Sequence, residues 1–473
     1  DYGAYGFMNF LPGGKHAKGT MRPIYHYESN NYLGEIPEAE ETYTVVGLMN
    51  EHQLTIHETT FGGREELTDT ITGLLDYGSL MYVTLQRART AREAIKVLTD
   101  LANTYGYESE GESFTLADPN EVWVMDLIGK GPGRKGVVWV AVRIPDDCIS
   151  GHANHSRIHQ FPLKDKDNCL YSKDVISFAR EKGYFSGKDK DFSFADAYAP
   201  ADFGALRFCE ARVWSFFNRW AADDMSVYLS YAEGDTKAAP MPLYVKPKQP
   251  LSLQDVKDMM RDHYEGTPLA LDSDLGQGPW EMPYRPTPLS FEVDGKKYFN
   301  ERPISTQQTA NVYVSQMRSW LPREIGGVLW FGNDDPNMVA YTPVYCSSLY
   351  VPECYAAGTA DCFTFSTRSA YWVQNWVSNM VYPRYSALFP EVKSTRDRLE
   401  KDYTSLQAET EEKAKSMTHD EAVKFLSEYG SRTAQSMLYE WNQLAQTLIV
   451  KYNDMSVKRT NEQGQYEKTP GGN

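Results

Sequence analysis

The sequence predicts an α+β protein in which helices cover a largely antiparallel β-sheet. Three observations support this prediction: strand patterns that follow one another through short turns, helical patterns before and after them, and a composition that can build a large core. Of the 473 residues, 41% are hydrophobic and 24% are charged, as is typical of globular proteins. Strands joined by hairpins are antiparallel, because parallel neighbours need a long crossover. Helices on either side of such strands indicate a layered fold.

Residues 42–64 form the predicted centre of the sheet. An apolar run at 45–49 predicts a strand that is covered on both faces, and residues 50–53 predict a tight turn. Residues 54–61 predict the returning strand, which ends in Thr59, Thr60 and Phe61 before Gly62-Gly63. The segment is therefore expected to be a core hairpin.

Further strands and helices follow from local signals. Residues 113–127 predict a hairpin that turns at 118–120, and 137–144, 312–316 and 327–331 predict strands. Residues 203–220 carry apolar side chains at helical spacing. Helices are also expected to start at three capping boxes, in which a side-chain oxygen and an acid three positions later satisfy free N–H groups. These boxes are Thr90 with Glu93, Ser252 with Asp255, and Thr418 with Glu421.

Loops and domain organisation complete the expectation. The first helix is expected to end at Gly106 and the second at Gly266, since glycine favours helix C-termini. Loop-like stretches are 1–41, 151–161 and 267–300, and 163–193 is predicted to be a surface excursion. From about residue 390 the chain becomes helical and charged, with Trp441, Leu444 and Leu448 on one helix face. The predicted division is therefore a sheet-containing region at 1–390 and a helical region at 391–473.

Charge and hydropathy exclude some classes of partner. The formal charge is −16, so neither a nucleic acid nor an anionic membrane surface would gain by counterion release. No stretch approaches 18 consecutive apolar residues, so no membrane span is expected. The aromatic-rich chain and its start at Asp1 favour an exported bacterial protein, periplasmic or extracellular, with the cytoplasm as the alternative.

Six cysteines are too few for a disulfide scaffold. Cys346, Cys354 and Cys362 are close enough in sequence to include one bridge, whereas Cys148, Cys169 and Cys209 have the pattern of core thiols. No C-x-x-C pair indicates zinc or redox chemistry.

The loop at 151–161 contains the most suggestive polar residues. His152, His155 and His159 would share a face if the segment were helical, and would then offer a metal site, but Ser150-Gly151 argues against a helix. The alternative is that Asn154 and Arg157 act, because an amide can donate to an oxyanion and a guanidinium can grip a carboxylate. Structural roles for both residues remain open at this point.

Other catalytic motifs are missing from the sequence. It contains no G-x-S-x-G, P-loop or dinucleotide fingerprint. The pair Asp334-Asp335 is interpreted as a surface feature. Local chemistry alone therefore leaves the function open.

Several segments together resemble one family. VVGLMNEHQLTIHETTFGGREEL, ARTAREAIKVLTDLANTYGY, ESFTLADPNEVWVMDLIG, HANHSRI, MMRDHYEGTP, ERPISTQQTANVYVSQ and LPREIGGVLWFGNDDPNMVAYTPVYC resemble the bacterial dipeptidases of the N-terminal-nucleophile (Ntn) hydrolase superfamily. Penicillin V acylases and bile-salt hydrolases are more distant relatives of that family. The segments span nearly the whole chain in family order.

The resemblance implies a four-layer αββα sandwich that hydrolyses dipeptides or small peptides without a metal or organic cofactor. It also implies an N-terminal cysteine as nucleophile, with its own α-amine as base. An α-amine has a pKa of about 7.7–8.0 and can therefore accept a proton near neutral pH. No cysteine precedes Cys148, so the implied nucleophile lies upstream of Asp1. If Asp1 is instead the mature end, the chain is expected to be inactive or one piece of a two-piece protein.

The resemblance also assigns roles to individual residues. Asn154 resembles the family asparagine that donates to the oxyanion, and Thr60 resembles the position that completes that hole. Asp1 resembles an aspartate near the nucleophile's amine, and Arg302 an arginine whose charge would favour thiolate. Arg157 is a weaker candidate for substrate binding; it and Asn50 could instead brace the loop and the turn.

Competing functions are retained as alternatives. An Ntn amide hydrolase acting on N-acyl amino acids or bile-salt-like substrates would differ in its substrates. A non-catalytic homologue that binds small peptides would lack the nucleophile. A metallohydrolase using His152, His155 and His159 would be sensitive to chelators. Homo-oligomerisation is compatible with each reading.

Overall fold

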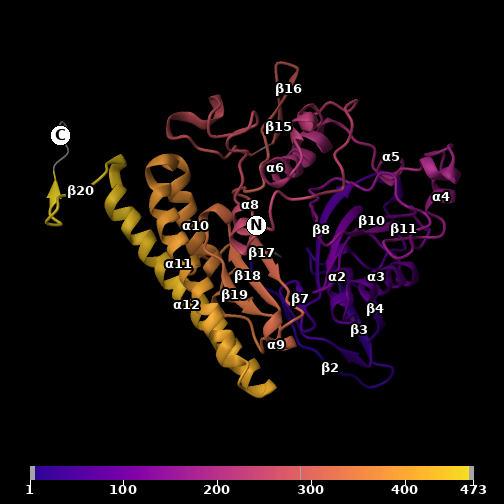
Figure 1. The fold of residues 1–473 in the computed structure, drawn as a ribbon, viewed down its shortest axis with the longest axis horizontal. Coiled ribbons are helices and arrows are strands. Elements are labelled where there is room, and N and C mark those ends of the chain that lie inside the picture. The colour runs from indigo at the N-terminus through magenta and orange to yellow at the C-terminus, as the bar shows by residue number, and fades with distance from the viewer. Residues whose placement is uncertain (1–5, 288, 468–473) are drawn as a thin grey trace.

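The computed structural model of the protein describes residues 6–287 and 289–467. Its larger sheet contains eight strands, each antiparallel to its neighbours, in the order β1-β6-β7-β8-β9-β10-β11-β13 (Figure 1). The strands are β1 (Phe10–Leu11), β6 (Val45–Val46), β7 (Met49–Asn50), β8 (Thr55–Gly62), β9 (Gly111–Ala117), β10 (Val122–Gly129), β11 (Val137–Ile144) and β13 (Cys169–Tyr171).

One face of this sheet is covered by two helices, α2 (Tyr77–Leu85) and α3 (Ala91–Tyr105). Thr90 caps α3 by accepting a hydrogen bond from Glu93 N, and Gly106 follows its last turn as predicted. Ile95 and Leu98 are buried against the sheet, and each such side chain stabilises the fold by about 1.5–3 kcal/mol relative to an exposed one. The amphipathic pattern of the sequence therefore positions this layer.

A second antiparallel sheet contains β17 (Asn311–Gln316), β18 (Val328–Asn333) and β19 (Thr342–Tyr345), with β18 in the middle. Three helices pack against this sheet: α10 (Ala370–Val381), α11 (Tyr385–Ala414) and α12 (His419–Tyr452) (Figure 1). Every residue of β18 is buried. The expected α+β class, with antiparallel sheets and a C-terminal helical region, is confirmed.

The two sheets approach each other closely at Gly47, in the turn between β6 and β7. Its φ of +58° is a left-handed conformation that favours glycine. A Cβ atom there would lie 2.4 Å from Leu329 Cδ2 on β18 and 3.1 Å from Tyr313 on β17. Farther along, His57 Nε2 on β8 lies 3.4 Å from Ser315 Oγ on β17. The two sheets therefore contact each other at β6–β8 and β17–β18.

The remaining elements surround this body. On the β10–β13 side, α4 (Val175–Glu181) and α5 (Phe194–Tyr198) cover the sheet face opposite α2 and α3. The π-helical η3 (Ala205–Glu210) continues directly into α6 (Ala211–Trp220), and α8 (Leu253–Met259) flanks β17. The short helices are α7 (Leu229–Ala232), α9 (Arg323–Gly326), η1 (Glu65–Leu67), η2 (Asp189–Asp191), η4 (Met225–Tyr228), η5 (Leu275–Trp280), η6 (Pro336–Met338), η7 (Glu353–Tyr355), η8 (Tyr382–Arg384) and η9 (Asn453–Met455).

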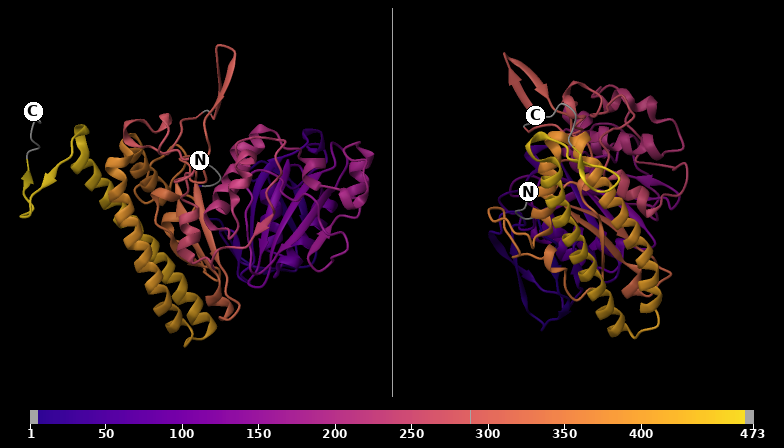
Figure 2. Two further views of the ribbon diagram at one scale, coloured as in Figure 1. Left: turned by 45° about the horizontal axis from the view of Figure 1, so that its top comes forward. Right: turned by 90° about the vertical axis from the view of Figure 1, so that its left-hand side faces the viewer.

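Within the described ranges, five two-stranded pairs lie outside the main sheets. One of them, β15–β16, is a hairpin that projects from the body (Figure 2). The paired strands are β2 (Gly14–Lys15) with β5 (Glu41–Thr42), β3 (Met21–Tyr25) with β4 (Tyr32–Pro37), β12 (Ile149–Ser150) with β14 (Tyr244–Val245), β15 (Ser290–Val293) with β16 (Lys296–Phe299), and β20 (Arg459–Thr460) with β21 (Tyr466–Glu467).

Several expectations are confirmed in detail. The hairpin at 113–127 turns at 118–120, and 137–144 forms β11. Residues 203–220 are largely helical, and 151–161 is a loop. In α12 the Glu421 carboxylate accepts from Thr418 N–H, and Trp441 is fully buried. The predicted division at residue 390 falls within α11, and the two-region organisation stays a prediction.

Four expectations are wrong. The apolar run at 45–49 is not one strand, because Gly47 reverses the chain and splits it into β6 and β7. The excursion at 163–193 contributes β13 to the edge of the large sheet. The helix expected at 252–265 ends at Met259, although its capping box is present. The loop-like stretch 267–300 contains the β15–β16 hairpin, which turns at Asp294-Gly295.

The open question of a disulfide among Cys346, Cys354 and Cys362 is answered by the structure, in which they form none. All six cysteines are free; Cys346 and Cys354 are buried, whereas Cys362 is exposed. Cys169 is a buried thiol as expected, while Cys148 and Cys209 are only partly buried. Within the described residues, no helix has both the length and the apolar character needed to cross a membrane.

Candidate active site

Asn154 and Thr60, which are far apart in sequence, meet at the end of β8. Asn154 Nδ2 donates to the Thr60 carbonyl oxygen at 2.8 Å. Asn154 lies in the loop after β12 with a left-handed φ of +56°, a conformation that asparagine tolerates better than most residues. The loop is held by Asp126 of β10, whose Oδ2 accepts from Ser156 Oγ and from Arg157 N. The resemblance therefore paired two residues that the fold brings into contact.

Arg212 of α6 fixes the other end of the Asn154 amide. Its Nη2 donates to Asn154 Oδ1 at 3.0 Å and lies 3.3 Å from the Ala153 carbonyl oxygen, while its Nε donates to Phe208 O. A guanidinium can only donate and a carbonyl can only accept, so the two contacts determine which way the amide faces. One N–H of the Asn154 amide then bonds to Thr60, and the second stays available to a ligand.

Thr60 contributes differently from the expectation that it completes a hole of donors. Its hydroxyl donates to Glu112 Oε1 at 2.7 Å on the neighbouring strand β9, and its carbonyl accepts from Asn154. Burial, followed by the charge of Glu58, raises the pKa of Glu112 well above its usual value. Thr60 therefore connects the buried acids Glu58 and Glu112 to the Asn154 amide, and its role is to hold that amide in place.

Arg302 lies between the projecting hairpin and β17 and is partly buried. Burial lowers the pKa of its guanidinium, and the positive charge of Arg212 lowers it further. Tyr264 donates from its hydroxyl to the Arg302 carbonyl oxygen at 2.7 Å, which holds the backbone. Within the described part of the chain, the Arg302 guanidinium has no ion-pair partner.

Arg157 and Asn50 make contacts that favour bracing roles. The Arg157 guanidinium is buried, pairs with Glu210 at 2.9 Å and donates to the carbonyl oxygens of Gly151 and Pro242. Asn50 Nδ2 donates to the carbonyl oxygens of Leu85 and Ala88, and its Oδ1 accepts from two turn N–H groups. Neither side chain therefore presents its polar group to a ligand.

The three histidines of the loop do not form a metal site. His152 is clamped between β8 and β9, with Nδ1 2.6 Å from Thr59 Oγ1 and Nε2 2.7 Å from Thr115 Oγ1. Burial lowers the pKa of His152 to about 3, so the ring is neutral at physiological pH. His159 instead lies 3.2 Å from Ser193 Oγ. The metal alternative required a helix, and the segment is a loop.

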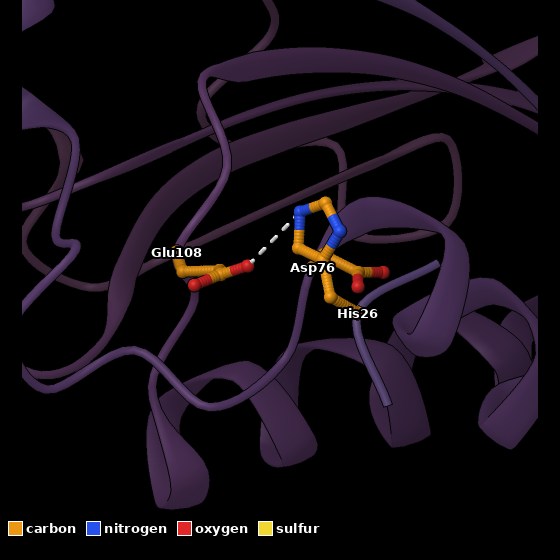
Figure 3. Close-up of side chains that lie close together, drawn as sticks. All are labelled: His26, Asp76 and Glu108. Atoms are coloured by element: carbon orange, nitrogen blue, oxygen red, sulfur yellow. Dashed lines mark ion pairs between the residues drawn. The ribbon is translucent and has the colours of Figure 1, made fainter. Parts of the chain in front are cut away.

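The described residues contain one cluster with the spacing of a metal site, formed by His26, Asp76 and Glu108 (Figure 3). Its ligand atoms lie within 4.8 Å of one another. However, Ser29 N donates to His26 Nδ1 at 3.1 Å, which leaves the proton of a neutral ring on Nε2, facing Glu108 Oε1. Asp76 is engaged as the N-cap of α2. The contacts therefore indicate a structural His26–Glu108 contact beside a helix cap.

A cavity of about 920 Å³ adjoins the Asn154–Thr60 contact. Its polar wall includes Thr59, which precedes Thr60, Arg212, which contacts Asn154, and the hydrogen-bonded pair Thr115 and His152. Its apolar wall comes mainly from β10, α6 and α8, through Val124, Ile144, Val213, Phe216, Val256 and Met260. Asn154 and Thr60 do not line the cavity themselves, but their neighbours Ala153 and Thr59 do.

Asp334-Asp335 was interpreted as a surface pair, and that interpretation is wrong. Both carboxyl groups are fully buried at the end of β18. Asp334 accepts from Asn375 Nδ2 and from the Ser378 hydroxyl, and burial raises its pKa to about 7. The pair connects β18 to α10. The sequence could not show this, because two adjacent aspartates read the same whether they are exposed or buried.

Sequence reasoning missed Arg212, and Asp1 lies outside the described residues. Arg212 lies within a run of apolar and charged residues that also contains Arg207 and Arg219, and nothing in the sequence distinguishes the three. Its special position arises only because α6 packs beside the loop of Asn154. No local signal would have identified it.

Fold and site together define an α+β protein with a fixed carboxamide beside a cavity that Arg212 lines. These groups are suited to stabilising an oxyanion. The chain belongs to peptidase family C69, whose sequence pattern matches residues 10–398. The resemblance to the Ntn-type dipeptidases is thereby confirmed, as is the expected class of cysteine-type peptidase at the level of the family.

Individual relatives support the same assignment. The chain is 26% identical to a probable dipeptidase from Salmonella dublin over 342 residues, which covers 68% of this chain and 70% of the relative. It is 24% identical to a probable dipeptidase from Latilactobacillus sakei, covering 65% of this chain and 58% of the relative. A probable dipeptidase B from Streptococcus pyogenes serotype M1 is 25% identical, with 64% of this chain and 55% of the relative covered.

Proposed function

We propose that this protein is a dipeptidase that uses an N-terminal cysteine nucleophile and forms an acyl-enzyme intermediate. One observation carries the proposal: the Asn154 amide is held by Thr60 and Arg212 so that one N–H remains available beside a cavity. The names of the relatives and the family membership support small peptides as substrates.

In the proposed reaction, the cysteine thiol of the mature N-terminus attacks the scissile carbonyl carbon. Its own α-amine, with a pKa of about 7.7–8.0, accepts the thiol proton and returns it to the leaving amine. The oxygen of the tetrahedral intermediate becomes negative and accepts from the free N–H of Asn154. Water then attacks the thioester and releases the N-terminal amino acid.

The arrangement of the sheets supports a place for the nucleophile. In the described part of the chain, β17 is the edge strand of the second sheet, and α8 beside it contributes Val256 and Met259 to the cavity wall. We propose that the segment carrying the cysteine enters this space and that the whole forms the four-layer αββα sandwich of the Ntn hydrolases. Asp1 would then lie near the nucleophile's amine.

The test is a substrate comparison with the intact, mature protein. Release of free amino acids from unmodified dipeptides is measured beside hydrolysis of N-acyl amino acids and of bile-salt amides, with and without a chelator. The proposal expects dipeptides to be the best substrates and the chelator to have no effect. Preference for acyl amides, activity that needs a metal, or no hydrolysis would contradict it.

A further inference from the structure

Arg212 and Arg302 differ from the other buried arginines nearby in having no acidic partner. Arg157 pairs with Glu210, and Arg207 pairs with Glu301. Among the described residues, neither Arg212 nor Arg302 forms an ion pair.

The acids of this region are already engaged. Besides Glu210 and Glu301, Asp262 bonds to Arg219 and to Ser215 Oγ. Burial lowers the pKa of the Arg302 guanidinium, and the positive charge of Arg212 lowers it further, because like charges repel in a partly buried site. Among the described residues, therefore, no acidic side chain forms an ion pair with Arg212 or Arg302.

The position of the pair relative to Asn154 indicates which anion would fit. Arg212 touches Asn154 and lines the cavity, and Ile304, two residues after Arg302, lines it as well. In a dipeptide the C-terminal carboxylate is one residue beyond the scissile carbonyl, and consecutive Cα atoms are about 3.8 Å apart. A carbonyl oxygen bound by Asn154 would thus place the carboxylate within reach of a group adjacent to Asn154.

We infer that Arg212 and Arg302 form the binding site for the free α-carboxylate of the residue that leaves. This inference rests on the proposed function and adds a substrate rule: the scissile bond must be the last in the peptide, with an unblocked C-terminus. The fork of an arginine binds a carboxylate through two parallel hydrogen bonds, which gives both affinity and orientation. The length of the substrate is restricted as a consequence, because a longer peptide would place a neutral amide where the carboxylate should bind.

The test separates binding from catalysis. N-acetyl-leucine and N-acetyl-leucinamide, which differ only in the carboxylate, are titrated into the full-length protein by calorimetry. Arg302→Gln removes the charge, Arg302→Lys keeps the charge without the fork, and Arg134→Gln is the control, since Arg134 is exposed and pairs with Glu181. Arg212 is left unchanged because it also orients Asn154.

Wild type and Arg134→Gln are expected to bind the acid about 10- to 100-fold more tightly than the amide, the range of a charge-assisted hydrogen bond. Arg302→Gln is expected to lose most of this preference, and Arg302→Lys to keep part of it. The amide's affinity reports whether each variant is folded. Equal binding of acid and amide by wild type, binding of neither, or a preference that survives Arg302→Gln would overturn the inference.

Parallel kinetics keep the two proposals distinguishable. Wild type and Arg302→Gln are assayed with a free dipeptide and with the same dipeptide as its C-terminal amide. The inference expects Arg302→Gln to raise KM for the free dipeptide far more than for the amide. An equal loss on both substrates assigns Arg302 to the nucleophile and overturns carboxylate binding. A wild type that keeps its carboxylate preference in calorimetry but hydrolyses no dipeptide contradicts the proposed function alone.

Discussion

Replacing Asn154 is the perturbation with the clearest calculated effect. The proposed oxyanion donor is one amide N–H, and removing a donor of this kind typically lowers kcat about 10²- to 10³-fold, or about 2.7–4 kcal/mol. The substitution also removes the contacts with Thr60 O and Arg212 Nη2, each of which contributes about 1 kcal/mol to stability. The activity and stability effects must therefore be separated.

The left-handed backbone of Asn154 provides the means to separate them. Alanine at φ +56° carries a strain of about 1–2 kcal/mol that glycine does not. Asn154→Ala and Asn154→Gly should thus show the same loss of turnover, while the glycine variant is more stable by about that amount. Asn30 has a φ of +57° and is exposed, so Asn30→Ala is a matched control for backbone strain with full activity.

The assay is steady-state dipeptide hydrolysis at 25 °C, with urea unfolding of each variant to confirm the folded state. Folded Asn154→Gly with turnover within about threefold of wild type would refute the oxyanion role, since that falls far below the 10²-fold loss expected for a lost donor. A defect in Asn154→Ala that glycine restores would show that strain, not a missing donor, caused it.

Two further predictions concern stability. Burial lowers the pKa of His152 to about 3, so its contribution to stability is complete above about pH 6.5 and is lost as the pH falls; between pH 7 and pH 5 it should lose about 2 kcal/mol. Unfolding titrations at both pH values should show a smaller loss for His152→Gln than for wild type. Gly47→Ala should cost about 2–4 kcal/mol, because a positive φ combines with a Cβ 2.4 Å from Leu329. Gly133 also has a positive φ, but a Cβ atom there would meet open space, so Gly133→Ala measures backbone strain alone. Its melting temperature should fall less than that of Gly47→Ala. Equal losses in the two variants would contradict the close contact between the sheets.

Local signals in the sequence were sufficient for the elements they encode directly. The hairpin at 113–127 was predictable because its turn residues separate two apolar runs. Helix α3 was predictable because Thr90 caps a sequence with one apolar face. These features depend on interactions between residues close in the chain.

Tertiary contacts account for most of the misses. Gly47 interrupts an apolar run because a second sheet, built from residues near 313 and 329, approaches it. The three-residue strand β13 is too short to produce a pattern, and it forms because β11 offers an unpaired edge. By contrast, Asp294-Gly295 is a local signal for a β-hairpin, so the hairpin within 267–300 was predictable from the sequence.

The candidate site shows the same division. Asn154 and Thr60 were identified through resemblance, and the fold brings them to 2.8 Å. Arg212 was not identified, because its role depends on packing between α6 and a loop almost sixty residues away in sequence. Asp334 was misjudged because burial, which sets its pKa near 7, is invisible in a dipeptide.

The identity of the residue that becomes acylated decides the mechanism most directly. The active mature protein is inactivated with leucine chloromethyl ketone, which places an alkylating carbon at the scissile position, and the modified peptide is sequenced by mass spectrometry. The account predicts one adduct per chain, on the sulfur of a cysteine at the mature N-terminus. An adduct on Cys209 or on any other internal side chain, with parallel loss of activity, would contradict it.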